Sequence, residues 1–162
     1  MDILHWLNDT LGGEFCFTVL VSMIPVIELR GGIPFGVSVG LPVWMAYLAA
    51  IIGNMLPVPF IVVYIRRIFQ WMRRHLPRLN HLVSKLEEKA HLKGKKVTKY
   101  KYLGLAIFVA IPLPGTGAWT GALAAAFLDM PLRKALPSIF AGVLIAGFLI
   151  TGLTYGFTSI FA

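Results

Sequence analysis

Two charged residues lie inside the first long apolar run of the sequence, at 15–40. Glu28 and Arg30 are separated by one leucine and are surrounded by prolines and glycines. A charge at membrane depth is costly and is usually functional. Because proline removes a backbone donor and a glycine pair weakens a helix, we expect a broken backbone here. The stretch 23–40 is therefore predicted to form the tip of a helical hairpin. The residues that shape this tip are Pro25, Gly31, Gly32 and Pro34.

A second stretch with the same character lies at 111–121, inside the apolar run 103–128. Each stretch is followed by a short break that contains a proline, at 40–42 and at 129–131, and then by a long apolar segment. The chain is therefore predicted to contain two copies of one unit. The residues that shape or line the second tip are Pro112, Pro114, Gly115, Thr116, Gly117, Trp119 and Thr120.

The composition is that of a membrane protein. Of the 162 residues, 57% are hydrophobic, and the mean hydropathy is +0.77. Soluble domains have an apolar share nearer 45–50%. The segments 43–65 and 136–157 carry no charge, and each is long enough for a hydrocarbon core that needs roughly 20 helical residues. We therefore expect an all-α integral membrane protein with two spanning helices.

Most of the positive charge lies in one block. The formal net charge is +8, and twelve of the fifteen Lys and Arg residues fall within 66–101, against two acids. A block between membrane segments follows the positive-inside rule, so we expect a cytoplasmic connector and no nucleic-acid partner. Apolar residues at helical spacing within 79–86 predict an amphipathic helix there. Residues 1–14 predict a short interfacial helix that ends at Gly12 and Gly13.

The basic residues also distinguish two topologies. If all four apolar runs crossed the membrane, Arg133 and Lys134 would face outward, against the positive-inside rule. If the two broken runs re-enter and return, both residues lie on the side of the connector. The second topology gives two inverted repeats, the architecture of many transporters, with both termini outside. The predicted layout is a single plasma-membrane domain over 1–162, with the first repeat at 15–65, the connector at 66–101 and the second repeat at 103–158.

In this architecture the two tips meet near the membrane midplane and form the candidate site. Helices that begin there point backbone N–H groups and positive dipole ends at the ligand, so we expect an anionic small molecule or lipid head group. Arg30 adds donors that match a phosphate, and Glu28 could couple transport to protons. Alternatively, Glu28 and Arg30 form a structural ion pair. No nucleophile set, metal site or cofactor is predicted, so an enzyme is not expected. The residues predicted to bind substrate are Arg30, Gly31, Gly32, Gly115, Thr116, Gly117 and Trp119.

The first spanning segment contains an interruption near its middle. Asn54 is followed by two prolines, Pro57 and Pro59. Prolines at this place predict a kink that serves packing, or a stretch of backbone that lines the substrate site. Small residues on both spanning segments favour close helix contact, which makes a homodimer a further prediction.

The motif Glu28-x-Arg30-Gly-Gly-Ile-Pro34, together with the segment 112–119, resembles the small multidrug export protein family, a distant relative of the DedA/VTT membrane superfamily. The stretch 121–133 is also similar to the segment after the second DedA hairpin. The resemblance implies re-entrant hairpins, inverted repeats and movement of undecaprenyl phosphate or phospholipids. DedA proteins place arginines around the Pro-Gly of the second hairpin, whereas this chain has none there.

Three functions follow as predictions. The first is an ion-coupled transporter or flippase for a lipid phosphate or phospholipid head group. The second is a proton-coupled exporter of small amphipathic molecules such as drugs. The third is a membrane scaffold that transports nothing, in which Glu28 and Arg30 are only structural.

Overall fold

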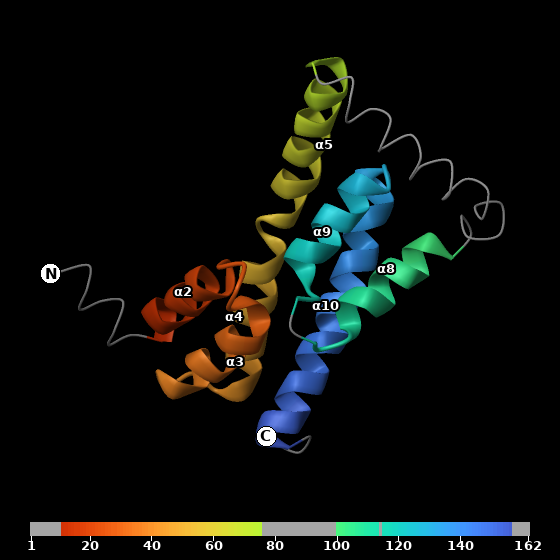
Figure 1. Ribbon diagram of the computed structural model, residues 1–162. Helices are drawn as coiled ribbons and strands as arrows, with labels where there is room; N and C mark the ends of the chain where they lie inside the picture. Colours follow the sequence, from red (N-terminus) through yellow and green to blue (C-terminus); the bar gives the residue numbers. More distant parts are fainter. Residues whose placement is uncertain (1–10, 76–99, 114, 157–162) are drawn as a thin grey trace, which may run out of the picture.

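The computed structural model describes residues 11–75, 100–113 and 115–156, and every regular element within them is a helix (Figure 1). This agrees with the predicted all-α class. The predicted amphipathic helix within 79–86, Pro114 and most of the predicted interfacial helix lie outside the described residues. The helices are α2 (Leu11–Ser22), α3 (Glu28–Ser38), α4 (Val43–Met55), α5 (Val58–His75), α8 (Lys101–Ala110), α9 (Ala118–Phe127) and α10 (Leu132–Tyr155).

Two segments of the described chain are long and apolar enough to cross a membrane. One is Val43–Ile65, formed by α4 and the first part of α5, and the other is α10, with 24 residues. The prolines that follow Asn54 do break the first segment, since α4 ends at Met55 and α5 begins at Val58. α10 begins four residues before the predicted start, because Pro131 takes the N-cap position and Leu132 opens the helix.

The first unit consists of α2, α3 and the α4–α5 segment. The short helices α2 and α3 are joined by a break at 23–27 and both pack against α4. Ser22 lies where the three helices meet: a side chain at Gly32 on α3 or at Gly53 on α4 would collide with it. Glycine at both positions therefore permits the close packing of this unit.

The second unit, which consists of α8, α9 and α10, packs in the same way. The break between its short helices spans 111–117. A side chain at Gly121 on α9 or at Gly142 on α10 would collide with Val109 on α8. Val109 in this unit thus has the place that Ser22 has in the first, and the two helical units repeat the same contacts.

The turns into the long helices repeat as well. The N–H of Leu41 donates to the carbonyl of Gly36 at 3.0 Å, and the N–H of Met130 donates to that of Ala125 at 2.9 Å. Both are the long hydrogen bond of a helix end that passes through a left-handed residue. That residue is Gly40 in the first unit and Asp129 in the second. Leu41 and Met130 are buried, and a proline follows each of them.

Each pair of short helices returns to the end at which it started. At the end of α3, Gly40 lies beside the carboxylate of Glu14 in the first turns of α2. In the second unit the ammonium groups of Lys101 and Lys134 lie 5.2 and 5.4 Å from the ring centre of Tyr102. The beginnings of α8 and α10 are therefore neighbours.

The two units contact each other along their long helices (Figure 1). α10 packs against α8 of its own unit and against α4 of the first, and α5 packs against α9. The hydroxyl of Tyr47 on α4 donates to the carbonyl of Leu144 on α10 at 3.0 Å. Buried apolar residues from α3, α4, α5, α8, α9 and α10 form one continuous core.

The structure shortens the predicted first tip and corrects the predicted helix end at Gly12 and Gly13. The break lies at 23–27, whereas Gly31, Gly32 and Pro34 lie inside α3. Packing at Gly32 outweighs the roughly 1 kcal/mol that a glycine costs in a helix. Gly12 and Gly13 lie within α2, so the helix continues through them.

Candidate functional site

The side chain of Glu28 lies at the beginning of α9, in the other unit. Glu28 is the first residue of α3 and is only 6% exposed. Its carboxylate lies against Gly117, where a side chain would overlap it, and the backbone N–H of Trp119 donates a hydrogen bond to it. The N-cap residue of α9 is a glycine and has no side chain to cap the helix. Glu28 therefore caps α9 from a distant part of the chain, where a negative charge is favoured by the helix dipole.

Arg30 also reaches into the second unit. Its Nη2 donates to the carbonyl oxygen of Thr116 and lies 3.0 Å from the hydroxyl oxygen of the same residue. The hydroxyl oxygen of Thr116 is 2.6 Å from the carbonyl oxygen of Ile111 and 3.2 Å from the backbone nitrogen of Leu113. Thr116 thus holds the break at 111–117 in shape, and Arg30 fixes that break to α3.

Trp119, in the second unit, contacts the first unit. Its indole Nε1 donates to the carbonyl oxygen of Met23 at 3.2 Å, just beyond the end of α2. The last carbonyls of a helix lack intrahelical partners, so this bond satisfies one group at the C-terminal end of α2. Side chains from each unit therefore complete a helix end of the other.

The backbone of Glu28 is in an unfavourable conformation. Its φ is +49°, in the left-handed region that glycine adopts readily and other residues rarely do. Such a conformation costs about 1–3 kcal/mol and persists where the surroundings enforce it, which is common at functional sites. The backbone turn at Glu28 directs the carboxylate to α9.

The electrostatics of the tips depend on these two side chains. Among the residues whose side chains the structure describes, Glu28 is the one charged residue that is buried. The nearby positive charge of Arg30 and the N-terminal end of α9 both compensate its negative charge. The contacts made by Glu28 and Arg30 go to the second unit, so their role extends beyond a local ion pair at the first tip.

The other predicted site residues have different places. Gly32 is buried against Ser22, and Gly31 faces the side chain of Ile27, so both serve packing. Gly115 is exposed with open space around it, at a φ of +84°. The hydroxyl of Thr120 donates to the carbonyl of Gly117 at 3.2 Å. Pro25 and Pro112 lie in the two breaks, as predicted.

The structure brings together Glu28, Arg30, Thr116, Gly117 and Trp119 among the predicted residues. The partner of Trp119, the carbonyl of Met23, was not predicted. The sequence contains one signal for the cap at α9, because Gly117 precedes a helix and cannot itself supply a capping side chain. That signal shows that a cap is missing but does not identify Glu28 as its source.

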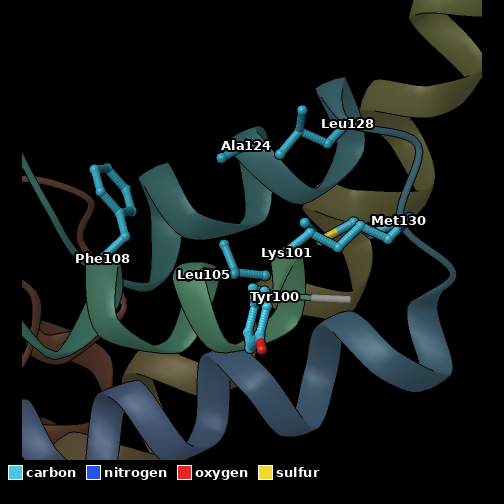
Figure 2. Close-up of a pocket in the computed structure, with 8 residues that line it drawn as sticks. Tyr100, Lys101, Leu105, Phe108, Ala124, Leu128 and Met130 are labelled. Atoms are coloured by element: carbon cyan, nitrogen blue, oxygen red, sulfur yellow. The ribbon is translucent and has the colours of Figure 1, made fainter. Parts of the chain in front are cut away.

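A pocket of about 480 Å³ lies between α8 and α9 (Figure 2). Its lining is almost entirely apolar, and Lys101 is its one charged residue. Figure 2 shows Phe108 near one end of the pocket and Leu128 and Met130 near the other. The lining residues are Tyr100, Lys101, Gly104, Leu105, Phe108, Ala124, Leu128 and Met130.

Residues 28–149 match the family model described as "Putative small multi-drug export protein". The match covers well over half of the chain, and the chain belongs to this family. Together with the two apolar helices, it identifies a membrane protein. No curated protein and no solved structure matches the chain. The relation to the DedA/VTT superfamily stays a prediction.

Proposed function

We propose that this small multidrug export family member is a transporter for anionic amphipathic molecules, with lipid phosphates as the favoured class. One observation carries the proposal: the N-terminal end of α9 already holds an anion, the carboxylate of Glu28. A helix beginning with free N–H groups binds carboxylate and phosphate alike. In this proposal Glu28 occupies the substrate site until a substrate displaces it.

The proposed membrane arrangement is two inverted repeats with re-entrant hairpins. The helices α8 and α9 have 10 residues each, about 15 Å at 1.5 Å per residue, or half of a hydrocarbon core of about 30 Å. The return of each helix pair to its starting end supports re-entry. Lys101 at the end of the connector then shares the cytoplasmic side with Lys134, and both termini lie outside.

The proposed mechanism is an exchange at α9. When Glu28 takes up a proton, it loses the charge that the end of α9 and Arg30 compensate. The N–H groups at the beginning of α9 then become available to the anionic group of the substrate. Nη2 of Arg30 is hydrogen-bonded to Thr116, and a guanidinium has further donors to offer a phosphate. Binding of the substrate and of the proton therefore favour each other.

The apolar pocket between α8 and α9 supports an amphipathic substrate. It can accept a hydrocarbon tail while Lys101, with Lys134 near the same tyrosine ring, attracts an anionic head group. These lysines lie at the end of α8 that adjoins the connector, opposite the tip. We propose that a substrate enters at this end and passes its head group to the tip.

Export of small drugs is the second candidate, and the family description favours it. For cationic drugs the site is less suited, because the charge of Glu28 is compensated by Arg30 and α9. Catalysis forms no part of the proposal, and neither transport candidate requires a cofactor.

The test is transport by the purified chain in proteoliposomes. A lipid phosphate with a fluorescent tail label is the probe, and its movement between leaflets is followed by chemical quenching from outside. We expect transport by the wild type and a fall to the rate of protein-free vesicles for Glu28→Gln. The matched control is Glu14→Gln, which neutralises an acid at the other end of the same helix pair and should leave transport unchanged.

Three results would contradict the proposal. The first is no lipid movement by wild-type protein that moves a neutral or cationic drug, which would favour the second candidate. The second is unchanged transport in Glu28→Gln. The third is loss of folded protein in Glu28→Gln, seen by size-exclusion chromatography, together with no transport by the wild type, which would indicate a scaffold.

A further inference from the structure

Gly104 is a helical glycine that no close packing requires. It lies in the first half of α8, where a glycine makes a helix less stable than an alanine does. At Gly32, Gly53 and Gly121 this loss is offset, because a side chain would collide with a neighbouring helix. At Gly104 a methyl group would meet nothing within 4 Å beyond the backbone of its own helix. Glycine at this position therefore keeps a space open.

The space beside Gly104 is the apolar pocket between α8 and α9 (Figure 2). On α9 another small residue, Ala124, lines the same pocket. A larger side chain at Gly104 would therefore occupy part of the pocket. The residues that line it from α8 have the spacing of one helix face, and they are Lys101, Gly104, Leu105 and Phe108.

The end of the pocket that adjoins the connector is positively charged. The ammonium groups of Lys101 and Lys134 lie 5.2 and 5.4 Å from the ring centre of Tyr102. The turn before α10 adds Asp129, and the first turn of α10 adds Arg133, so three basic residues and one acid lie at this end. In a binding pocket a few charged groups at one end of an apolar lining fix the orientation of the ligand. This pocket therefore suits an anionic head group with a hydrocarbon tail.

The pocket has a limited length. Lys101 and Phe108 are seven positions apart on α8, which is about 10 Å at 1.5 Å per residue. Figure 2 shows Lys101 beside Met130 and Phe108 at the other end. Next to Phe108, Val109 packs so closely against Gly121 of α9 that a side chain at Gly121 would collide with it. A hydrocarbon chain that extends from Lys101 to Phe108 has about the length of an octyl group.

We propose that this pocket is a loading site for a lipid phosphate and that Gly104 is the residue that admits its tail. The phosphate binds at Lys101 and Lys134, and the pocket holds the part of the tail nearest the head group, up to about the length of an octyl chain. A shorter tail leaves apolar surface uncovered and binds less tightly. A longer tail extends past Phe108 and gains little. The inference rests on the proposed transport function and adds where the substrate binds before it reaches the tip.

The test is photolabelling of the full chain in phosphatidylcholine vesicles, which needs no transport. The probe is octyl phosphate with a diazirine at the end of its tail, and mass spectrometry after proteolysis locates the label. We expect the label near Phe108, whereas a butyl phosphate probe should label residues nearer Lys101. Gly104→Leu fills the pocket and should reduce octyl labelling about tenfold. The control Ile107→Phe adds bulk on an exposed part of α8 outside the pocket and should retain the labelling.

A second probe tests the head group. Octyl glucoside with the same diazirine has the same tail and no charge. Replacing both Lys101 and Lys134 by Gln should weaken labelling by octyl phosphate several-fold and leave labelling by the glucoside unchanged. Equal labelling of the wild type by the two probes would overturn the site, because any membrane lipid could then occupy the pocket.

The site is also overturned if octyl phosphate labels Gly104→Leu as strongly as the wild type. If that variant does not fold, the wild type decides, and a label that stays in one place at every chain length overturns the site. Labelling of the pocket in a protein that moves no lipid phosphate would contradict the proposed function and leave the site standing. Transport of lipid phosphate without labelling of the pocket would overturn the site alone.

Discussion

The two units of this chain have the same packing but different chemistry. Each brings a short helix against a glycine of the next helix and a glycine of the long helix, at Ser22 in the first unit and at Val109 in the second. Each ends its second short helix in a left-handed turn followed by a proline. The shared features are those that determine backbone geometry.

The differences lie at the tips. When the turns at 40–42 and 129–131 are aligned, Glu28 and Arg30 of the first unit correspond to Gly117 and Trp119 of the second. The first unit supplies a carboxylate and a guanidinium. The second supplies the start of α9, where Gly117 offers no capping side chain, and an indole N–H donor. The two units are therefore complementary, because Glu28 of the first caps α9 and Trp119 of the second donates to the end of α2.

The largest loss of stability is expected at the two glycines of the long helices that pack against the short helices. Gly53→Ala and Gly142→Ala each place a methyl group against the backbone and side chain of the adjoining short helix. We expect both to lower the free energy of unfolding by about 1–3 kcal/mol, measured by thermal or denaturant unfolding in detergent. Gly104→Ala is the control, because a methyl group there meets nothing within 4 Å beyond the backbone of its own helix, and the helix should gain stability. A large loss of stability in only one of the two variants would show that the two glycines do not have equivalent packing roles.

A smaller and more specific effect is expected at the tip. Gly117→Ala places a methyl group where the carboxylate of Glu28 lies. We expect transport to be lost and stability to fall by about 1–2 kcal/mol, the value of a helix cap. In the background of Glu28→Ala the same substitution should cost much less stability, because the carboxylate is gone. Additive effects in this double-mutant cycle would show that the two residues are not coupled.

The smallest loss of stability is expected for the hydrogen bond from Trp119 of the second unit to Met23 of the first. Trp119→Phe keeps an aromatic ring and removes the donor to Met23, which should cost about 1 kcal/mol of stability. Thermal unfolding of the purified variant measures the change. Trp44→Phe on an exposed face of α4 should leave the midpoint unaltered. Equal unfolding midpoints for wild type and Trp119→Phe would show that the hydrogen bond from Trp119 to Met23 does not stabilise the protein.

The sequence predicts the elements that depend on apolar length. The two long helices, the two breaks and the internal repeat follow from runs of hydrophobic residues and from recurring prolines. It makes the first break too long, because glycine pairs weaken an isolated helix but also permit close packing. The pattern predicts that Gly32 weakens the helix, whereas in the structure Gly32 permits close packing against Ser22. Which of the two applies depends on Ser22, a neighbour in space that the pattern does not reveal.

The residues of the candidate site were predicted more fully than their contacts. Charge inside an apolar run identifies Glu28 and Arg30, and glycine beside a helix start identifies Gly117. Their pairing across the units depends on the left-handed backbone of Glu28 and on the arrangement of six helices, which no local pattern encodes. For the same reason, the unpartnered amide of Asn54 is visible only in the structure.

The cap on α9 also has a consequence for biosynthesis. Glu28 leaves the ribosome long before Gly117 and Trp119 exist, so in the proposed re-entrant arrangement the first helix pair enters the membrane before Glu28 can cap α9. Membrane insertion of the first unit alone should favour a protonated Glu28 or an arrangement that keeps it at the water interface. The final depth of the first hairpin would then be reached only after the second unit has been made. A chain truncated after α5 should therefore insert less deeply than the same segment in the complete protein.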